Sequence, residues 1–318
     1  MPYRESLRLK KNVLSSTALL AVIACLLWST AFVGVKVGLQ FCGPFAFAGL
    51  RFMLSGILLV PFWWKRRPAP HAVRNHAGLI LLVACFQTFT LYGLFYFGMT
   101  LVPGALAAMV IGASPLVSAV LAHYFMTGDR MTAIKAASIG LGLSGVTILS
   151  ISRLPWASPA GLAELAGIGI LLLSNFSGAL GNIFVARHRS DLEPVFLNSA
   201  QIFLGGLCLW ALSLALEGPM TIQIPWPFWV SLLWLAFLSA AAFSIWFILL
   251  RRPSVRVSEL NLWKFLIPVC GAALSWFLLP GEAPNFWTLT GMTCIAAAIV
   301  LFNGPTLRTF VSPGTKTR

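Results

Sequence analysis

Residues 16–38 read STALLAVIACLLWSTAFVGVKVG, a stretch in which Lys36 is the single charged side chain. An α-helix needs about 20 mostly apolar residues to cross the hydrocarbon core of a bilayer. A cleaved signal peptide has a shorter apolar region with a polar exit, whereas this run continues past Cys25 without interruption. The stretch therefore predicts a membrane-spanning helix that is not cleaved.

The rest of the chain shares the character of this stretch. Of its 318 residues, 58% are hydrophobic and 9% are charged. A soluble domain carries about a quarter charged residues, so a chain this poor in charge predicts an integral membrane protein. With short links between them, roughly ten spans of about 20 residues fit into this length.

Apolar segments alternate along the chain with links that carry Gly, Pro or charged residues. Each segment has the length of a membrane span rather than of a strand. We therefore predict an all-α, polytopic membrane protein with ten transmembrane helices, at residues 16–38, 44–64, 77–99, 103–125, 132–151, 161–186, 194–216, 227–250, 256–279 and 286–305.

Basic residues exceed acidic ones by 22 to 8, which gives a formal net charge of +14. In a soluble protein this excess would favour nucleic-acid binding. Here the bases form short runs between apolar segments, as expected when Lys and Arg set the orientation of a membrane protein. We therefore exclude nucleic acid as a partner and expect the lipid bilayer and a small-molecule substrate instead.

The positions of these bases also predict the orientation. With the N-terminus inside, Lys36 and Arg153 fall on the outer side and Arg51 and Lys264 fall within spans, which leaves 18 of the 22 bases on the cytoplasmic side. The positive-inside rule thus predicts that both termini lie in the cytoplasm. We expect the protein in the inner or plasma membrane. The expected ends are a basic N-terminus at residues 1–15 and a tail at residues 306–318.

An internal repeat relates the two halves of the chain. Pro115 and Pro268 are 153 positions apart, and Gly128-Asp129 and Gly281-Glu282 have the same spacing. Each repeat would hold five spans, and an odd number places the two halves in opposite orientations, as in many secondary transporters. We expect two inverted five-helix repeats, at residues 16–152 and 161–305.

Three stretches resemble a known family. Residues 27–32 (LWSTAF) resemble the start of its first repeat, residues 47–52 (FAGLRF) its second span, and Pro268 through Gly281-Glu282 its closing motif. By these motifs the chain is similar to the EamA-type permeases of the drug/metabolite transporter superfamily. Departures are Asp129, where Glu is more usual, and Lys264, where an apolar residue is expected. The resemblance implies ten helices around a central cavity and export of small metabolites, often amino acids or related compounds.

Two cations within spans are candidates for substrate binding. Lys264 lies eight residues into its span, and a Lys at mid-membrane costs about 2.5–3.5 kcal/mol on insertion scales, so such a group normally faces a cavity or a partner. Lys264 is expected either to line a cavity, where it would hold a carboxylate or phosphate, or to extend to the interface or to Glu259. Arg51 is expected to contact either the substrate or carbonyl groups at a helix end.

Neutral polar and aromatic residues within spans complete the set of candidates. Asn198 and Gln201 are three positions apart and therefore share one helix face. Amides within a membrane either join helices or contact a substrate, and both alternatives stay open. The predicted substrate-binding residues are Lys264, Trp28, Asn198, Gln201, Gln87, Tyr92, Trp246 and Arg51.

Several classes of function have no support in the sequence. No P-loop, zinc-ligand motif or nucleophile motif is present, so we expect neither a catalytic site nor a metal or cofactor. We predict a secondary transporter that exports small metabolites by alternating access, as a monomer or homodimer. The alternatives are a sugar-phosphate or nucleotide-sugar exchanger, which would use the cations, and a membrane-embedded lipid-modifying enzyme.

Overall fold

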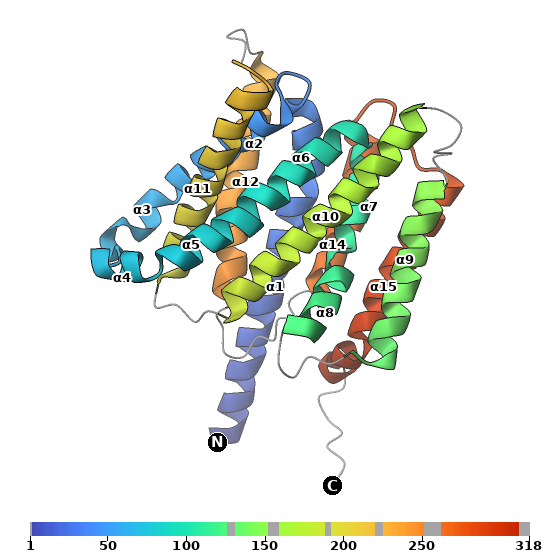
Figure 1. The fold of residues 1–318 in the computed structure, drawn as a ribbon. Coiled ribbons are helices and arrows are strands. Elements are labelled where there is room, and N and C mark those ends of the chain that lie inside the picture. The colour runs from blue at the N-terminus through green and yellow to red at the C-terminus, as the bar shows by residue number, and fades with distance from the viewer. Residues whose placement is uncertain are drawn as a thin grey trace.

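The computed structural model describes residues 2–125, 131–151, 159–187, 192–219, 225–250 and 262–311, and every regular element in these ranges is helical (Figure 1). Helix α1 begins at the end of the bundle where α15 finishes. The elements are α1 (Pro2–Gly38), α2 (Pro44–Leu58), α3 (Val60–Trp63), η1 (Trp64–Arg66), α4 (Pro70–Asn75), α5 (Ala77–Val83), η2 (Ala84–Thr90), α6 (Leu91–Leu101), α7 (Gly104–Gly112), α8 (Ser114–Phe125), α9 (Ala133–Ile151), α10 (Pro159–Arg187), α11 (Pro194–Leu216), α12 (Trp226–Leu250), η3 (Leu262–Phe265), α14 (Leu266–Leu278) and α15 (Phe286–Val311).

Within the described ranges, seven helical segments are long and apolar enough to cross a membrane, and three more are apolar but shorter. The predicted class, an all-α polytopic membrane protein, is confirmed. The shorter segments fall within the fifth, ninth and tenth predicted spans. The seven are Thr17–Gly38, Pro44–Arg66, Ala77–Leu101, Gly104–Phe125, Ala160–Val185, Pro194–Leu216 and Trp226–Leu249, and the three are Ala133–Ile148, Leu266–Leu278 and Phe286–Ala298.

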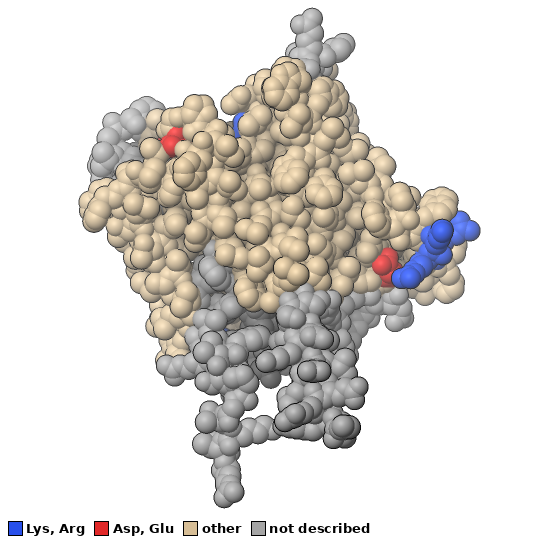
Figure 2. Space-filling view, turned by 180° about the vertical axis from the view of Figure 1, so that it is seen from behind, with Lys and Arg blue, Asp and Glu red and all other residues tan. Residues whose placement is uncertain are grey.

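The surface has the composition that a bilayer requires. Figure 2 shows one face on which charged side chains are almost confined to the edges of the described part. Large apolar side chains such as Phe62, Trp226 and Phe277 are more than two-thirds exposed. In water such a surface would be unfavourable, whereas in lipid it is the ordinary exterior of a helical bundle.

Corresponding helices of the two repeats pack against each other. Pro44 and Pro194, which are 150 positions apart, begin α2 and α11, where a Pro at the start of a helix costs no hydrogen bond. These two helices lie side by side, and so do α9 and α15, the last helices of the two repeats (Figure 1). Contacts between α1 and α12 likewise have their counterpart between α10 and α6. The internal repeat of the sequence is therefore also a repeat of the packing.

Glycines allow these helices to approach closely. A Cβ atom on Gly49 would lie 2.7 Å from the backbone nitrogen of Trp210, and one on Gly206 would lie 2.7 Å from that of Met53. Between α9 and α15, a Cβ atom on Gly145 would lie 2.7 Å from the carbonyl oxygen of Gly291. Small residues that permit backbone contact are a general means of joining helices in membranes.

The two prolines of the repeat interrupt their helices. Because Pro268 has no N–H, the Lys264 carbonyl lacks the partner that a continuous α-helix would supply. Residues 262–265 form the 3₁₀ turn η3, and α14 begins only at residue 266. Pro115 acts in the same way near the junction of α7 and α8. The predicted span at residues 256–279 therefore contains a 3₁₀ turn at Lys264, and residues 251–261 lie outside the described ranges.

Candidate functional site

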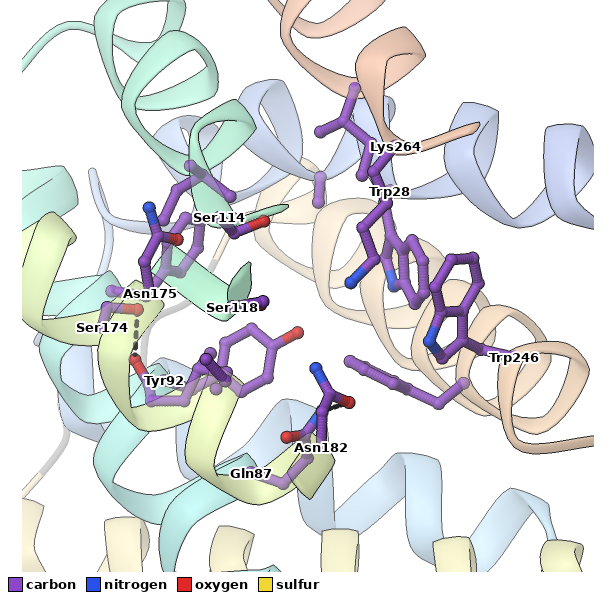
Figure 3. A pocket seen from close by; sticks show the side chains of 18 of the residues that line it. Trp28, Gln87, Tyr92, Ser114, Ser118, Ser174, Asn175, Asn182, Trp246 and Lys264 are labelled. Atoms are coloured by element: carbon purple, nitrogen blue, oxygen red, sulfur yellow. Dashed lines mark hydrogen bonds between the residues drawn. The ribbon is translucent and has the colours of Figure 1, made fainter. Parts of the chain in front are cut away.

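A cavity of about 130 Å³ lies between the two repeats and is lined by residues from both (Figure 3). It is bordered by α1, α2, α6, α7, α8, α10, α12, α14 and the η2 and η3 segments. Six of the eight predicted site residues line it, namely Trp28, Arg51, Gln87, Tyr92, Trp246 and Lys264.

Two of the segments that border the cavity, η2 and η3, depart from regular α-helix at the cavity itself. Gln87 lies on η2, a π-helical segment that interrupts the helix between α5 and α6. Such segments are frequent at functional sites because they reorient side chains within a span. Two serines of α10 bond to carbonyl groups at this interruption: Ser177 Oγ donates to Phe86 O at 2.8 Å and Ser174 Oγ to Leu91 O at 2.9 Å. Backbone groups at membrane depth are satisfied in this way by a neighbouring helix.

Lys264 and two tryptophans form one wall of the cavity. The Lys264 Nζ atom lies 4.7 Å from the centroid of the Trp246 ring, a cation–π contact. The Trp28 ring packs edge-on against Trp246, with their centroids 5.2 Å apart. Of the two alternatives for Lys264, the structure places it at the cavity, while Glu259 lies outside the described ranges. Since no described lining residue is an Asp or Glu, the charge on this wall is positive.

Arg51 joins three helices at one end of the cavity. Its side chain is 1% exposed, with Nε donating to Ser239 Oγ at 2.9 Å and Nη1 donating to the Tyr96 hydroxyl at 2.8 Å. The guanidinium carbon also lies 4.7 Å from the centroid of the Phe52 ring. The expected helix-end carbonyls are thus replaced by side-chain hydroxyls of α6 and α12. Arg51 lines the cavity, and two of its five N–H donors are used by bonds within the protein.

Gln87 and Tyr92 lie on the side of the cavity opposite Lys264 (Figure 3). Gln87 is 5% exposed, and its Nε2 atom donates to Asn182 Oδ1 at 3.5 Å. Two polar atoms around the cavity have no partner among the described residues: Gln87 Oε1, an acceptor, and Trp28 Nε1, a donor. Buried polar groups are nearly always paired, so a small shift of these side chains would let them bond to water or to a ligand in the cavity.

Hydroxyl and amide groups of α8 and α10 complete the polar part of the lining. Ser114 and Ser118 come from α8, and Ser174, Asn175 and Asn182 come from α10. The sequence-based prediction did not include them. The signal available for finding them is their spacing, because four positions on α8 and seven between the asparagines on α10 each keep one helix face.

Asn198 and Gln201 do not line this cavity. They belong to a chain of hydrogen bonds between helices, which starts with Thr88 Oγ1 donating to Gln201 Oε1 at 2.6 Å. Gln201 Nε2 then donates to Asn198 Oδ1 at 3.0 Å, and Asn198 Nδ2 donates to Ser244 Oγ at 3.1 Å. The shared helix face that the sequence predicted for Asn198 and Gln201 is present. The hydrogen bonds of these two side chains join α11 to η2 and α12.

In the described residues, no group of His, Cys, Asp or Glu side chains is placed to hold a metal ion. A bundle of membrane-spanning helices around a small, partly polar cavity is typical of membrane transport proteins. The chain belongs to the EamA-like transporter family, which matches residues 15–151 and 165–304. It therefore contains two EamA domains, and the predicted membership of the drug/metabolite transporters is confirmed, as is the prediction that it is not an enzyme.

Individual relatives agree with this membership. The uncharacterized transporter YvbV of Bacillus subtilis is 28% identical over 290 residues, which cover 90% of this chain and 91% of that protein. Two proteins named "Probable amino-acid metabolite efflux pump", from Escherichia coli and Salmonella typhimurium, are 30% and 31% identical and cover 89% of this chain and 91% of their own. A crystal structure at 21% identity covers 92% of this chain and 99% of its own with a TM-score of 0.64, and thus has the same fold.

Proposed function

We propose that this protein is a secondary transporter that exports small metabolites, amino acids or related compounds, from the cytoplasm by alternating access. The observation that carries the proposal is the central cavity, which residues of both repeats line and which Lys264 borders together with the polar residues Gln87 and Asn182. The names of the Escherichia coli and Salmonella typhimurium relatives support amino-acid metabolites as the cargo and efflux as the direction.

In this proposal the chain spans the membrane ten times, as two inverted repeats with both termini in the cytoplasm. The excess of Lys and Arg at the expected cytoplasmic links supports the orientation. The packing of α2 on α11 and of α9 on α15, which are corresponding helices of the two repeats, supports a twofold relation between them.

The position of the cavity along the helices supports loading from the cytoplasm. Ser118 lies on α8, the helix that leads from the middle of the fourth span to the proposed cytoplasmic end, and Asn182 lies near the corresponding end of α10. At the other end, Arg51 and its partners Tyr96 and Ser239 form a buried layer. This arrangement is that of a transporter closed to the outside, and export requires the layer around Arg51 to open.

Exchange of sugar phosphates or nucleotide sugars is the second candidate, which Lys264 favours because an ammonium group also binds phosphate. The cavity volume of about 130 Å³ is below the roughly 300–1,000 Å³ of pockets for drug-sized ligands. Its other lining residues include aromatic side chains such as Phe32, Phe95 and Phe243. A small metabolite fits these walls better than a nucleotide sugar does.

The test is a metabolite profile of the medium from cells that overexpress the chain, compared with cells that overexpress Lys264→Met. We expect one or a few small acids to accumulate with the wild-type chain and to fall to background with the variant, at equal protein abundance. Lys65→Met is the matched control, because Lys65 is exposed and far from the cavity in sequence and structure. Two negative results together would contradict the proposal: expression of the chain leaves the metabolite profile of the medium unchanged, and the purified chain moves no solute in proteoliposomes.

A further inference from the structure

A second pocket opens at the proposed outer end of the helical bundle. It has a volume of about 370 Å³ and lies between the ends of α1 and α6 and the turn that follows α14. Its polar lining residues are Lys36, Gln40, Thr100 and Glu282, and the buried side chain of Met99 also lines it. Because the central cavity is smaller, at about 130 Å³, a metabolite that the cavity holds also fits this pocket.

This outer pocket lies directly beyond the central cavity along two helices. Phe32 of α1 and Phe95 of α6 line the cavity. Lys36 and Met99, four positions further along the same two helices, line the outer pocket. Four positions keep one face of a helix and correspond to a rise of about 6 Å. On both helices, a single turn thus separates the two spaces.

Aromatic rings close the connection between the two spaces. The Phe32 and Phe95 rings meet edge-on with their centroids 6.0 Å apart, and both side chains are buried. The Phe95 ring also packs against the ring of Tyr96, whose hydroxyl accepts from Arg51. This barrier is therefore continuous with the layer around Arg51, which export has to open.

Lys36 gives the outer pocket a cation on the side of the membrane where bases are rare. In the proposed orientation it is one of two bases on the outer side, whereas 18 of the 22 lie on the cytoplasmic side. The acidic groups that act on its charge are Glu282 and Glu164. Both oxygens of Glu282 already accept from backbone N–H groups, those of Gly104 and Ala105. Since Lys36 lines the pocket, its ammonium group can bind an anionic group that enters there.

We propose that the outer pocket is a second binding site for the exported metabolite, an exit site in which Lys36 binds the carboxylate that leaves Lys264. This inference rests on the proposed function and adds the step that follows the opening of the layer around Arg51. A carboxylate that passes the apolar rings of Phe32 and Phe95 loses its water, which is unfavourable unless an opposite charge is near. Lys36, one helix turn beyond the rings, supplies that charge.

Charged thiol reagents test this site before the metabolite is known. The full-length chain carries Thr100→Cys in the lining of the pocket, together with Cys42→Ala to remove the thiol in the turn after α1. Right-side-out membrane vesicles are treated with two membrane-impermeant methanethiosulfonates, the anionic sulfonatoethyl and the cationic trimethylammonioethyl reagent, and the ratio of their rates is compared with the ratio for β-mercaptoethanol. A nearby unit charge acts on the two reagents in opposite senses, so we expect the anion to be favoured roughly three- to tenfold more in the pocket than in free solution.

Three variants connect this preference to Lys36. Lys36→Met is expected to remove the preference for the anionic reagent, and Lys36→Arg to keep it because the charge stays. Lys65→Met is the control, since Lys65 is exposed in η1 and does not line the pocket.

Export gives a second readout, measured on the compound that accumulates in the medium with the wild-type chain. Lys36→Met is expected to lower kcat by roughly three- to tenfold, the effect of one unit charge on the passage of an anion. The KM on the cytoplasmic side is expected to stay unchanged, because Lys36 does not line the central cavity. A merely structural role of Lys36 would instead lower the melting temperature and the abundance of the variant, with kcat per molecule unchanged.

The Thr100→Cys chain with Lys36 in place decides the inference even where Lys36→Met fails to fold. The inference is overturned if this thiol does not react from outside, or if the anionic reagent is favoured no more than in free solution. An unchanged kcat of Lys36→Met at equal abundance also overturns it. In each of these cases the proposed function stands as long as the wild-type chain changes a metabolite of the medium. The proposed function fails if no metabolite of the medium changes and the purified chain moves no solute.

Discussion

Glu282 caps the helix that begins at Gly104, although 178 positions separate the two residues. Oε1 accepts from the Gly104 N–H at 2.6 Å, and Oε2 accepts from the Ala105 N–H at 2.9 Å. The first turn of a helix leaves N–H groups unpaired and carries a partial positive charge, so a carboxylate there is stabilising on both counts. Here the carboxylate comes from the other repeat, and the bond thus joins the two halves of the chain.

Glu282→Gln is expected to lower the melting temperature of the purified protein in detergent. The neutral amide keeps the size of the side chain but offers one acceptor where the carboxylate offers two, and loss of a cap costs about 0.5–2 kcal/mol. Glu193→Gln is the matched comparison, because the Glu193 side chain accepts from Phe196 N and so caps its own helix rather than a helix of the other repeat. A melting temperature equal to that of the wild type would contradict a stabilising role for the bond to Gly104.

The two interrupted helices approach each other closely at Gly112. A Cβ atom there would lie 2.5 Å from Pro268 Cγ and 2.6 Å from its Cβ, a separation that real atoms do not adopt. We therefore expect Gly112→Ala to destabilise the fold by about 1–3 kcal/mol, as overpacking does elsewhere. Gly140→Ala is the control, since a Cβ at Gly140 meets nothing within 4 Å. Thermal unfolding of both variants in the same detergent measures the difference, and equal melting temperatures would contradict the close packing.

The fold was predictable because its main signals, the apolar runs and the internal repeat, can be read directly from the sequence. Spans follow from the lengths of apolar runs, and the repeat follows from Pro115 and Pro268 and from Gly281-Glu282. The structure supplies the physical reason for that last motif. Gly281 has φ of +80°, a conformation that favours glycine, in the turn that brings the Glu282 carboxylate to α7. The interruption at Lys264 does not show in the hydropathy, because apolar composition continues through it, and Pro268 is the residue of the sequence that accompanies it.

The site was only partly predictable because hydropathy does not say which face of a helix lies at the cavity. Trp28, Gln87 and Lys264 were found as polar or aromatic residues within spans, and they do line it. Asn198 and Gln201 have the same signature but bond to neighbouring helices. The two cases differ only in the packing of distant segments, to which a single sequence gives no access.

Gln201→Met tests the role that the hydrogen bonds give to Gln201. The substitution removes the bonds to Thr88 and Asn198 at nearly constant volume, and bonds of this kind between membrane helices are worth about 0.6 kcal/mol on average. We expect a slightly lower melting temperature and an unchanged KM for export. An increased KM at unchanged stability would instead place Gln201 on the substrate path.

Trp28→Phe isolates the contribution of a single N–H group at the cavity. Phenylalanine keeps a ring against Phe243 and Trp246 but removes the unpartnered Nε1–H donor. If that donor binds the ligand, its loss costs about 1–3 kcal/mol of binding, because a polar group of the bound ligand is left unpaired. We expect the KM for the exported metabolite to rise by roughly 5- to 150-fold, with protein abundance and melting temperature close to those of the wild type.

Trp234→Phe is the matched control for this prediction. Trp234 also donates through its indole nitrogen, to Thr30 Oγ1 at 2.9 Å, but its side chain is 40% exposed on the outside of the bundle. Its loss is expected to leave the KM unchanged, since no part of Trp234 lines the central cavity. Equal KM values for wild type, Trp28→Phe and Trp234→Phe would show that the Trp28 donor serves no ligand. In that case the role of Trp28 at the cavity would be the packing of its ring against Trp246, beside Lys264.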